Sequence, residues 1–339
     1  MTPLKNILVV RTDRIGDVVL TLPIASIIKK HFPDSRVTFF LSEYTKPLAE
    51  NNPFIDDVIT PITSNGKIDI ISNVKQIKNK FDCVITAFPT YKIALILFLS
   101  GIKTRVGSGY RWYSFLFNRK VFDHRKTAEH HELEYNVRLL QQIGVNEDIN
   151  PSSIEFGLRA SQKSEQTVNA KLRGLGINAN DKFIIIHPGS GGSALDLPID
   201  SLKKIVQQLS ITNKIKILLT GSEKEKTLCQ LFALNNNTLN VASLFSLSEM
   251  IALIDRSILL ISNSTGPIHI AAALGKQVIG FYPKVRTCSE ERWGPYTNKK
   301  VIFKPDNSCS GHTIEQCREQ NCMASIKVEE VLNTINSKI

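Results

Sequence analysis

The segment TDRIGD places an acidic side chain where the chain turns from a buried apolar run, NILVVR, into a helix that begins VVLTLP. Gly16 permits the tight turn, and Asp17 stands in the first turn of the expected helix, at the carboxyl edge of a sheet. A carboxylate there either caps the helix or acts as a general base that removes a proton from an acceptor hydroxyl. Alongside such a base, we expect Arg11 or Arg14 to hold acceptor phosphate or developing charge. No GxGxxG motif is present, which argues against a dinucleotide site and a dehydrogenase.

A glycine-rich loop in the middle of the chain is typical of phosphate binding. The loop PGSGGSALDLP follows the strand-like run KFIIIH. Glycines such as Gly191 let backbone N–H groups approach phosphate oxygens, and Ser190 and Ser193 would add hydroxyl donors. The loop lacks the GK[ST] ending of a Walker motif, and a simple connecting turn is the alternative.

A third segment, NSTGPIHIAAALG, follows the apolar run SILLIS and reads as the start of a helix. Ser264 or Thr265 would cap this helix, and Gly266 and Pro267 suit its first turn. The free N–H groups at such a helix end form an anion site that suits a diphosphate. His269 lies one helical turn further on, and it either reaches the same ligand or packs against the sheet.

Two other residues of the second half each have a functional and a structural interpretation. In KILLTGSEKEK, Gly221 ends a strand and Glu225 follows in the first turn of a helix. Glu225 either accepts hydrogen bonds from ribose hydroxyls or is a solvated surface carboxylate. Phe245 precedes the helix LSEMIALI and either stacks on a base or packs in the core.

The elements that must position these segments alternate between short β-rich runs and helical periods, as in a parallel sheet wound by crossover helices. Strands are expected at 6–11, 36–41, 57–60, 81–87, 104–107, 182–187, 215–220, 240–242, 258–262 and 277–281. Helices are expected at 17–31, 45–51, 69–80, 91–100, 129–143, 199–210, 223–234, 247–254 and 265–274. The fold class predicted is α/β, with two Rossmann-like, doubly wound domains that face a central cleft.

The polar segment 144–161 contains Pro151 and is the predicted linker. It would join an N-terminal acceptor-binding domain, 1–150, to a C-terminal nucleotide-sugar-binding domain, 151–339. Helix 328–335 could pack on either domain. Two domains also fit the length of 339 residues, because single hydrophobic cores stop growing at about 250–300 residues.

Composition narrows the classes of partner and compartment. The formal net charge of +11 indicates an anionic partner, and the sequence has no basic run interleaved with aromatics, zinc-finger spacing or RNA-binding signature, so we expect no nucleic acid. No apolar run is long enough to span a bilayer, and the first residues do not resemble a secretory signal. Six cysteines suit a reducing compartment. We therefore expect a cytoplasmic protein with free thiols.

Two further features have open interpretations. The segment RVGSGYRWYSFLFNRK mixes aromatic side chains with arginines, of which Arg105 and Arg111 are candidate acceptor contacts. This segment either meets a phosphorylated lipid or the membrane interface, or forms an ordinary core edge. The cluster of Cys309, Cys317 and Cys322 is spaced more loosely than the CxxC pairs of zinc sites, so we expect no metal.

Four motifs occur in order along nearly the whole chain: RTDRIGDVVLTLP, HPGSGG, GSEKE and SNSTGPIHIAAALGKQVIGFYP. Together they resemble glycosyltransferase family 9, the heptosyltransferases that build the lipopolysaccharide inner core. The resemblance implies a GT-B fold and an inverting, metal-independent transfer of heptose from ADP-heptose to a lipid-linked saccharide, without a cofactor. It makes Asp17 the catalytic base, Glu225 the ribose contact and Phe245 the residue beside the adenine. The implied nucleotide-sugar loop comprises Ser264, Thr265, Gly266 and His269.

The resemblance also implies the partners: a nucleotide-sugar and an anionic lipid-linked saccharide, met at the cytoplasmic face of the inner membrane. Two departures fall on the donor side. Family members often carry a Lys shortly before a Trp-Pro in the mid-chain loop, whereas SALDLP has Leu195 and Leu197 and no Lys. Their late loop commonly reads Asp-Thr-Gly, whereas here Ser264 replaces the Asp. A family 9 transferase with another nucleotide-sugar donor and a non-catalytic nucleotide-sugar-binding homologue therefore stay as alternatives.

Overall fold

The computed structural model describes residues 4–192, 194–212, 215–306 and 313–339. It contains two compact units, of which the first comprises Met1–Arg125 and Glu132–Leu158 and the second Lys126–His131 and Arg159–Ile339. The division after Leu158 lies inside the predicted linker 144–161, but later than the boundary we expected after residue 150. The short segment Lys126–His131 belongs to the second unit although the first unit flanks it in sequence, which no pattern in the sequence indicated.

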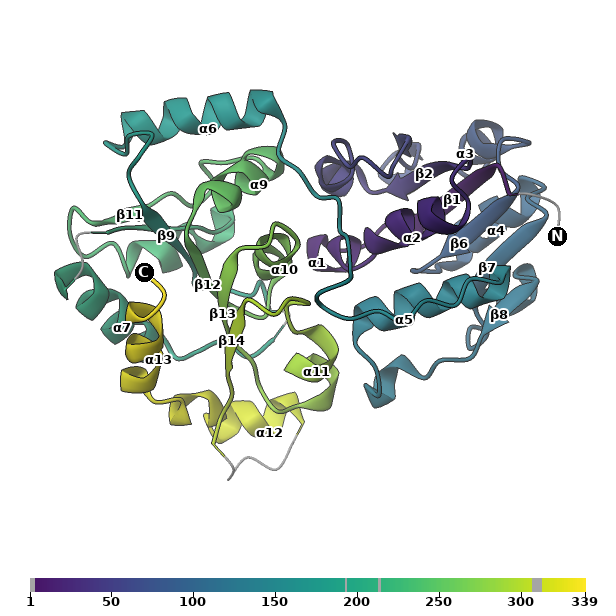
Figure 1. Ribbon diagram of the computed structural model, residues 1–339. Coiled ribbons are helices and arrows are strands. Elements are labelled where there is room, and N and C mark those ends of the chain that lie inside the picture. Colours follow the sequence, from purple (N-terminus) through teal and green to yellow (C-terminus); the bar gives the residue numbers. More distant parts are fainter. Residues whose placement is uncertain (1–3, 193, 213–214, 307–312) are drawn as a thin grey trace. The chain divides into compact units, whose positions relative to one another are not determined.

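The first unit contains a six-stranded parallel sheet in the order β3-β2-β1-β6-β7-β8 (Figure 1). Counted along this sheet alone, the order is 3-2-1-4-5-6, that of doubly wound dinucleotide-binding folds. Its central strands are buried on both faces, as the continuous apolar run NILVVR requires. The strand bounds are β1 Asn6–Arg11, β2 Arg36–Leu41, β3 Asp57–Ile59, β6 Cys83–Thr86, β7 Thr104–Ser108 and β8 Arg119–Val121. A separate antiparallel hairpin consists of β4 Thr63–Ser64 and β5 Lys67–Ile68.

The helices of the first unit begin and end at recognisable signals. The single helix expected over 17–31 is two helices, because Pro23 has no N–H to continue the first and starts the second instead. Asp69 and Thr90 cap α3 and α4. The bounds are α1 Ile15–Val19, α2 Pro23–His31, α3 Ile70–Ile77, α4 Tyr91–Leu99 and α5 Glu132–Arg138, with 3-10 turns η1 Glu43–Leu48, η2 Ser114–Leu116, η3 Arg125–Thr127 and η4 Leu139–Ile143.

The second unit repeats the same sheet topology. Its six parallel strands lie in the order β11-β10-β9-β12-β13-β14 (Figure 1). β9, with the sequence FIIIH, is buried along its full length and forms the centre of the sheet with β12. The bounds are β9 Phe183–His187, β10 Lys216–Leu219, β11 Thr238–Asn240, β12 Leu259–Asn263, β13 Gln277–Phe281 and β14 Lys300–Phe303.

Helices cover this second sheet. The C-terminal helix α13 packs against α7, and its apolar residues join the core of the second unit, which decides the question left open for segment 328–335. The bounds are α6 Gln162–Gly174, α7 Ile199–Thr212, α8 Lys226–Gln230, α9 Leu247–Arg256, α10 Gly266–Ala273, α11 Glu290–Trp293, α12 Ile314–Glu319 and α13 Val328–Asn336, with 3-10 turns η5 Glu223–Glu225, η6 Arg286–Cys288 and η7 Cys322–Ser325. Over the described part of the chain, no helix is long and apolar enough to cross a membrane.

Candidate active site

The candidate segments lie at the switch point of the sheet that carries them. In each sheet the connections run outward from two adjacent central strands, β1 with β6 in the first unit and β9 with β12 in the second. Loops at the carboxyl ends of such strand pairs are where doubly wound folds bind ligands. Arg11 is the last residue of β1 and Asp17 follows in α1, whereas the glycine loop follows β9 and α10 follows β12. Both units thus present the predicted residues where this topology favours ligand binding.

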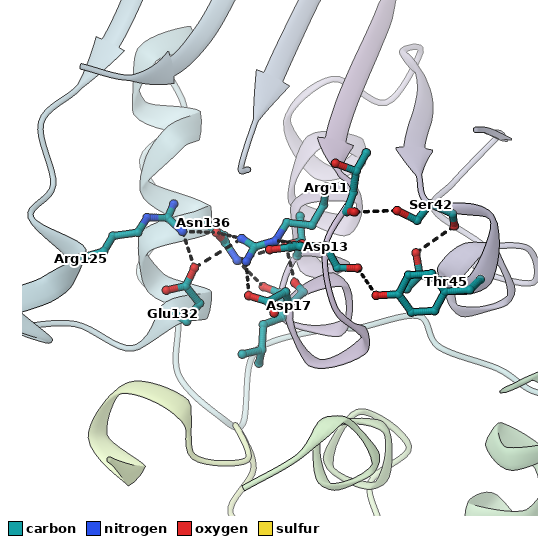
Figure 2. Close-up of polar contacts among 12 residues, drawn as sticks. Arg11, Asp13, Asp17, Ser42, Thr45, Arg125, Glu132 and Asn136 are labelled. Carbon is teal, nitrogen blue, oxygen red and sulfur yellow. Dashed lines mark hydrogen bonds and ion pairs between the residues drawn. The ribbon is translucent and has the colours of Figure 1, made fainter. Parts of the chain in front are cut away.

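In the first unit, Asp17 is held by a buried arginine (Figure 2). Arg11 is 2% exposed, and its Nη2 donates to Oδ1 of Asp17. Its Nε donates to Oδ1 of Asp13 at 2.7 Å, and its Nη1 lies 3.2 Å from Oδ1 of Asn136 and 3.4 Å from Oε1 of Glu132. We expected Arg11 to bind acceptor phosphate, but its nitrogens donate to side chains of its own unit. These contacts favour a role in orienting Asp17.

Burial sets the protonation behaviour of Asp17. Loss of solvent raises the pKa of its carboxyl to about 6, and the Asp13 and Glu132 carboxylates add to the rise, although the Arg11 guanidinium opposes it. A carboxylate with a pKa near 6 is largely ionised at neutral pH and still has appreciable affinity for a proton. Both properties are needed in a general base that works near neutral pH.

A second arginine contacts Glu132 and Asn136, two of the residues that hold Arg11. Arg125 donates to Oε1 of Glu132, and its Nη1 also lies 3.2 Å from Oδ1 of Asn136. The amide of Asn136 donates to the carbonyl of Leu20 at 3.1 Å and to the Thr21 hydroxyl at 3.2 Å, so α5 is tied to the break between α1 and α2. Sequence reasoning missed Glu132, Asn136 and Arg125, which lie more than a hundred residues from Arg11 and form no local motif with it.

The other three arginines expected to bind the acceptor differ in exposure. Arg105 donates from Nε to the carbonyl of Leu116 at 2.8 Å and from Nη1 to that of Ile102 at 2.5 Å. Its guanidinium also lies 5.2 Å from the ring centroid of Phe98, so its contacts favour a structural role at the start of β7. Arg14 and Arg111 are exposed, and their side chains make no hydrogen bond or ion pair within the described residues. They stay candidates for an acceptor contact.

In the second unit, the glycine loop after β9 has the conformation that its sequence predicts. Gly191 and Gly192 have φ values of +58° and +79°, and a Cβ at either would meet no atom within 4 Å. Their backbone is therefore exposed on the outer side of the loop. The Ser190 hydroxyl is buried and donates to the carbonyl of Ala194 at 3.3 Å, so its contacts lie within the loop. Ser193, the other expected hydroxyl donor, lies outside the described residues.

Glu225 reaches from the next strand's loop toward this glycine loop. Its Oε2 accepts hydrogen bonds from the backbone N and the hydroxyl of Ser222, at 2.8 and 2.7 Å. Burial raises its pKa, but these bonds and the nearby His187 outweigh burial and hold the pKa below its ordinary value. A Cβ on Gly189 would stand 2.1 Å from Oε1 of Glu225, and one on Gly221 would meet its Cβ at 3.0 Å. The two glycines thus allow an ionised carboxylate to lie between the loops.

Phe245 is mostly buried, so little of its ring is available for stacking on a base. It is 9% exposed, and Nζ of Lys171 lies 5.3 Å from its ring centroid. The same lysine pairs with Glu249 at 2.8 Å. The contacts of Phe245 therefore favour the packing interpretation, with a narrow exposed edge left for a base.

The start of α10 presents backbone donors next to a neutral histidine. Thr265 is the N-cap residue with extended φ and ψ of −152° and 170°, and its side chain makes no capping hydrogen bond to the amides of Gly266 and the following residues. His269 is 4% exposed, and its Nδ1 has no hydrogen-bond partner within the described residues. Burial, with a smaller effect from His131, lowers the pKa of His269 to about 3, so the ring is neutral at physiological pH. Ser264 is buried beside Tyr282, with which it hydrogen-bonds.

Comparison with known proteins relates these two sites to a family. A model of glycosyltransferase family 9 (heptosyltransferase) matches residues 70–323. A provisionally assigned glycosyltransferase of Haemophilus influenzae is 31% identical over 338 residues, covering 96% of this chain and 96% of the relative. The chain belongs to glycosyltransferase family 9. Lipopolysaccharide heptosyltransferase 3 of Escherichia coli K12 is 23% identical over 330 residues, covering 94% of this chain and 93% of the relative.

Solved structures of family 9 proteins share the fold. The family 9 glycosyltransferase of Veillonella parvula has a TM-score of 0.83 at 20% identity, covering 98% of this chain and 96% of that one. The E. coli ADP-heptose lipopolysaccharide heptosyltransferase II has a TM-score of 0.79 at 19% identity, covering 98% of each chain. These likenesses confirm the GT-B class predicted for the two Rossmann-like units, and membership of family 9 makes this chain a glycosyltransferase.

The mid-chain loop of this family 9 glycosyltransferase has the sequence SALDLP, without the lysine that the resemblance predicts. Leu195 and Leu197 are buried in the core of the second unit, and the N–H of Leu197 donates to Oδ1 of Asn263 at 2.9 Å. Asn263 also donates to the carbonyl of Pro188 at 2.6 Å, so one side chain joins both ends of the loop to β12. Asp196, between the two leucines, is exposed and hydrogen-bonds with Ser190. The loop therefore carries a carboxylate in the segment where the resemblance to family 9 led us to expect a lysine.

Two features outside the donor and base sites were left open by the sequence. Trp112 and Phe115 are 73% and 67% exposed, and Trp112 stacks on Tyr91 with 4.8 Å between ring centroids. The same segment buries Tyr113 and Phe117, which are 7% and 2% exposed, in a small cluster with Ala94 and Leu116. It therefore forms a core edge on one side and exposes aromatic rings on the other. Cys317 is buried in the core of the second unit and Cys322 packs against it, whereas Cys309 lies outside the described residues.

Proposed function

We propose that this family 9 glycosyltransferase moves a heptose from ADP-heptose to a lipopolysaccharide core or related glycan acceptor, with inversion at the anomeric carbon and without a metal or cofactor. The observation that carries the proposal is the Asp17 carboxylate, which stands at the switch point of the first sheet with a pKa of about 6. The names of the E. coli relatives support the sugar and the acceptor class.

In the proposed reaction, Asp17 accepts the proton of one acceptor hydroxyl as that oxygen attacks the anomeric carbon of the heptose. The new carbon–oxygen bond forms as the bond from the anomeric carbon to the nucleoside diphosphate breaks. The electron pair of the broken bond leaves with the diphosphate, and Asp17 ends protonated. A single displacement of this kind inverts the anomeric configuration.

The second unit would bind the donor and stabilise the leaving group. N–H groups in the first turn of α10 and in the glycine loop would donate to the diphosphate, as helix N-termini and glycine-rich loops do for other anions. The N–H of Gly191 donates to Glu225 in the free protein, so it would turn to the diphosphate when the donor binds. His269 would contact the same ligand as a neutral donor or acceptor. Glu225 would accept hydrogen bonds from the ribose, with Phe245 offering an edge to the base. On the acceptor side, Arg14 and Arg111 would contact anionic groups.

The donor assignment predicts a selective thermal shift. With ADP or ADP-heptose at about 100 times its dissociation constant, the free energy of unfolding should rise by about 2.7 kcal/mol. Because each kcal/mol corresponds to roughly 2–4 °C in a unit of this size, the melting temperature should rise by several degrees. UDP-sugars should leave it unchanged. If a UDP-sugar shifts the melting temperature and both adenine nucleotides do not, the donor is not ADP-heptose.

We also propose peripheral contact with the anionic surface of the inner membrane through the exposed aromatic segment after β7. Trp112 and Phe115 would insert between headgroups, and the basic residues Arg111, Arg119 and Lys120 would pair with lipid phosphates. Co-sedimentation with phosphatidylglycerol vesicles should fall about tenfold in a Trp112→Ala/Phe115→Ala variant. Replacing Ile211, which is 73% exposed in the second unit, by Ala serves as the matched control. If the unsubstituted protein, the double variant and the Ile211→Ala control bind the vesicles equally, the proposed membrane contact is refuted.

A further inference from the structure

The catalytic carboxylate shares its arginine with two other acidic side chains (Figure 2). Arg11 contacts Asp17 through Nη2, Asp13 through Nε at 2.7 Å and Glu132 through Nη1 at 3.4 Å. A guanidinium group has a fixed planar fork, so the direction in which its other nitrogens are held determines where Nη2 points. Whatever fixes the far side of Arg11 therefore orients its contact with Asp17.

Glu132 and Asn136 hold that far side. They stand one helical turn apart in α5, and both are buried, with exposed fractions of 2% and 0%. Each also contacts Arg125, whose Nη1 donates to Oε1 of Glu132 and lies 3.2 Å from Oδ1 of Asn136. A buried carboxylate such as Glu132 needs cationic or hydrogen-bonding partners, and here they are the two arginines.

We propose that Glu132 and Asn136 are positioning residues for the transfer reaction: they draw part of the Arg11 guanidinium away from Asp17, so that Asp17 stays basic enough to take the acceptor's proton. This inference rests on the proposed role of Asp17. Neither residue touches substrate in this account, since both act through Arg11. Arg125 balances Glu132 from the other side and limits how strongly Glu132 competes for Arg11.

The charge balance gives the sign of the effect. Among the residues that the structure describes, the ion pairs of this network join two guanidinium groups, Arg11 and Arg125, to three carboxylates, Asp13, Asp17 and Glu132. With all of them ionised, the carboxylates are in excess, and protonation of Asp17 relieves the excess. Two further titratable side chains lie near this network. Tyr44 of η1 donates from its hydroxyl to the backbone carbonyl of Asp13, and burial, Asp13 and Asp17 raise its pKa, whereas the guanidinium of Arg14 opposes that rise. Removing a negative charge should make Asp17 more acidic, and removing a positive charge should make it less acidic.

The test is the pH profile of kcat/KM for transfer, because its acid limb reports the base of the free enzyme. Glu132→Gln should move this limb to lower pH by about one pH unit, and Arg125→Gln should move it to higher pH. Glu147→Gln should leave the limb in place, because this carboxylate of the same unit pairs with Lys30 and His31 instead. Titration of the substrates is common to all variants, so it cannot produce shifts of opposite sign.

Glu132→Asp keeps the negative charge on a shorter side chain. Its acid limb should therefore lie closer to that of the unsubstituted protein than the limb of Glu132→Gln does. Arg125 is partly exposed, so its variant keeps the test available if Glu132→Gln does not fold. If both variants lower the rate equally at every pH and the limb stays fixed, the network is merely structural and the inference is overturned. That outcome differs from failure of the proposed function, which would appear as full turnover in a variant that lacks the Asp17 carboxylate.

Discussion

Asp17→Asn should lower the rate of transfer by roughly 10²- to 10⁴-fold, the range that a positioned general base contributes. Asparagine keeps the size of the side chain and a hydrogen-bond acceptor for Arg11, but it cannot take up a proton from the acceptor hydroxyl. The nucleotide is proposed to bind in the second unit, so the dissociation constant for ADP should stay within about twofold, well under the tenfold change that 1.4 kcal/mol represents. Steady-state kinetics and calorimetric titration of the same preparation measure both quantities.

Asp34→Asn is a suitable control for this variant, because Asp34 is an exposed carboxylate of the same unit. It should keep the full rate. Turnover by Asp17→Asn at the level of the control would remove Asp17 from the mechanism. An unsubstituted protein that binds nucleotide but shows no transfer with any donor would instead support the non-catalytic alternative.

Gly189→Ala should weaken nucleotide binding by roughly 10- to 100-fold, corresponding to one lost hydrogen bond to a charged group. A Cβ at this position would stand 2.1 Å from Oε1 of Glu225, so the carboxylate must move. Because the obstacle is the far end of a flexible side chain, the fold should adapt at small cost. Affinity should therefore fall while the melting temperature of the free protein changes little. Calorimetric titration with ADP and thermal unfolding separate the two effects.

Gly174→Ala provides the matched control for this glycine. Gly174 is the last residue of α6, and a Cβ there would meet no atom within 4 Å. Alanine restricts the unfolded chain more than glycine does, so this variant should be stabilised slightly and should bind ADP normally. Undiminished affinity in Gly189→Ala would show that Glu225 is not a nucleotide contact.

The interior of both sheets could be predicted from the sequence because a strand buried on both faces reads as a continuous apolar run. The bounds of β1, β2 and β13 agree with those expected. The edge strands β8 and β14 were missed, since RKV and KVIF are only partly buried and carry charges. Helix α6 was missed as well, because its buried residues form a narrow stripe, Ser164, Val168 and Leu172, on an otherwise polar helix.

In the candidate site, too, residues within local motifs could be predicted, whereas contacts between residues far apart in the sequence could not. Asp17, Gly191 and the start of α10 belong to local motifs of strand, glycine turn and helix, and the structure places each at the expected end of its strand. The partners of Asp17 could not be read locally. The contact between Arg11 and Glu132 joins residues 121 positions apart. The sequence shows that Arg11 is charged, but not which carboxylates pair with it in the folded protein. For this reason we expected Arg11 to contact the acceptor, whereas in the structure its guanidinium already binds side chains of its own unit.

The most direct test of the account is the product formed when the purified chain is incubated with ADP-heptose and a lipopolysaccharide inner-core acceptor. Mass spectrometry should show the acceptor heavier by one heptose, released ADP in equal amount, and no loss of product when a chelator is added. The anomeric configuration of the new linkage, read by NMR, should be opposite to that of the donor. An unmodified acceptor with ADP-heptose, together with product from another nucleotide-sugar, would contradict the proposed donor, and a retained configuration would contradict the single displacement with Asp17 as base.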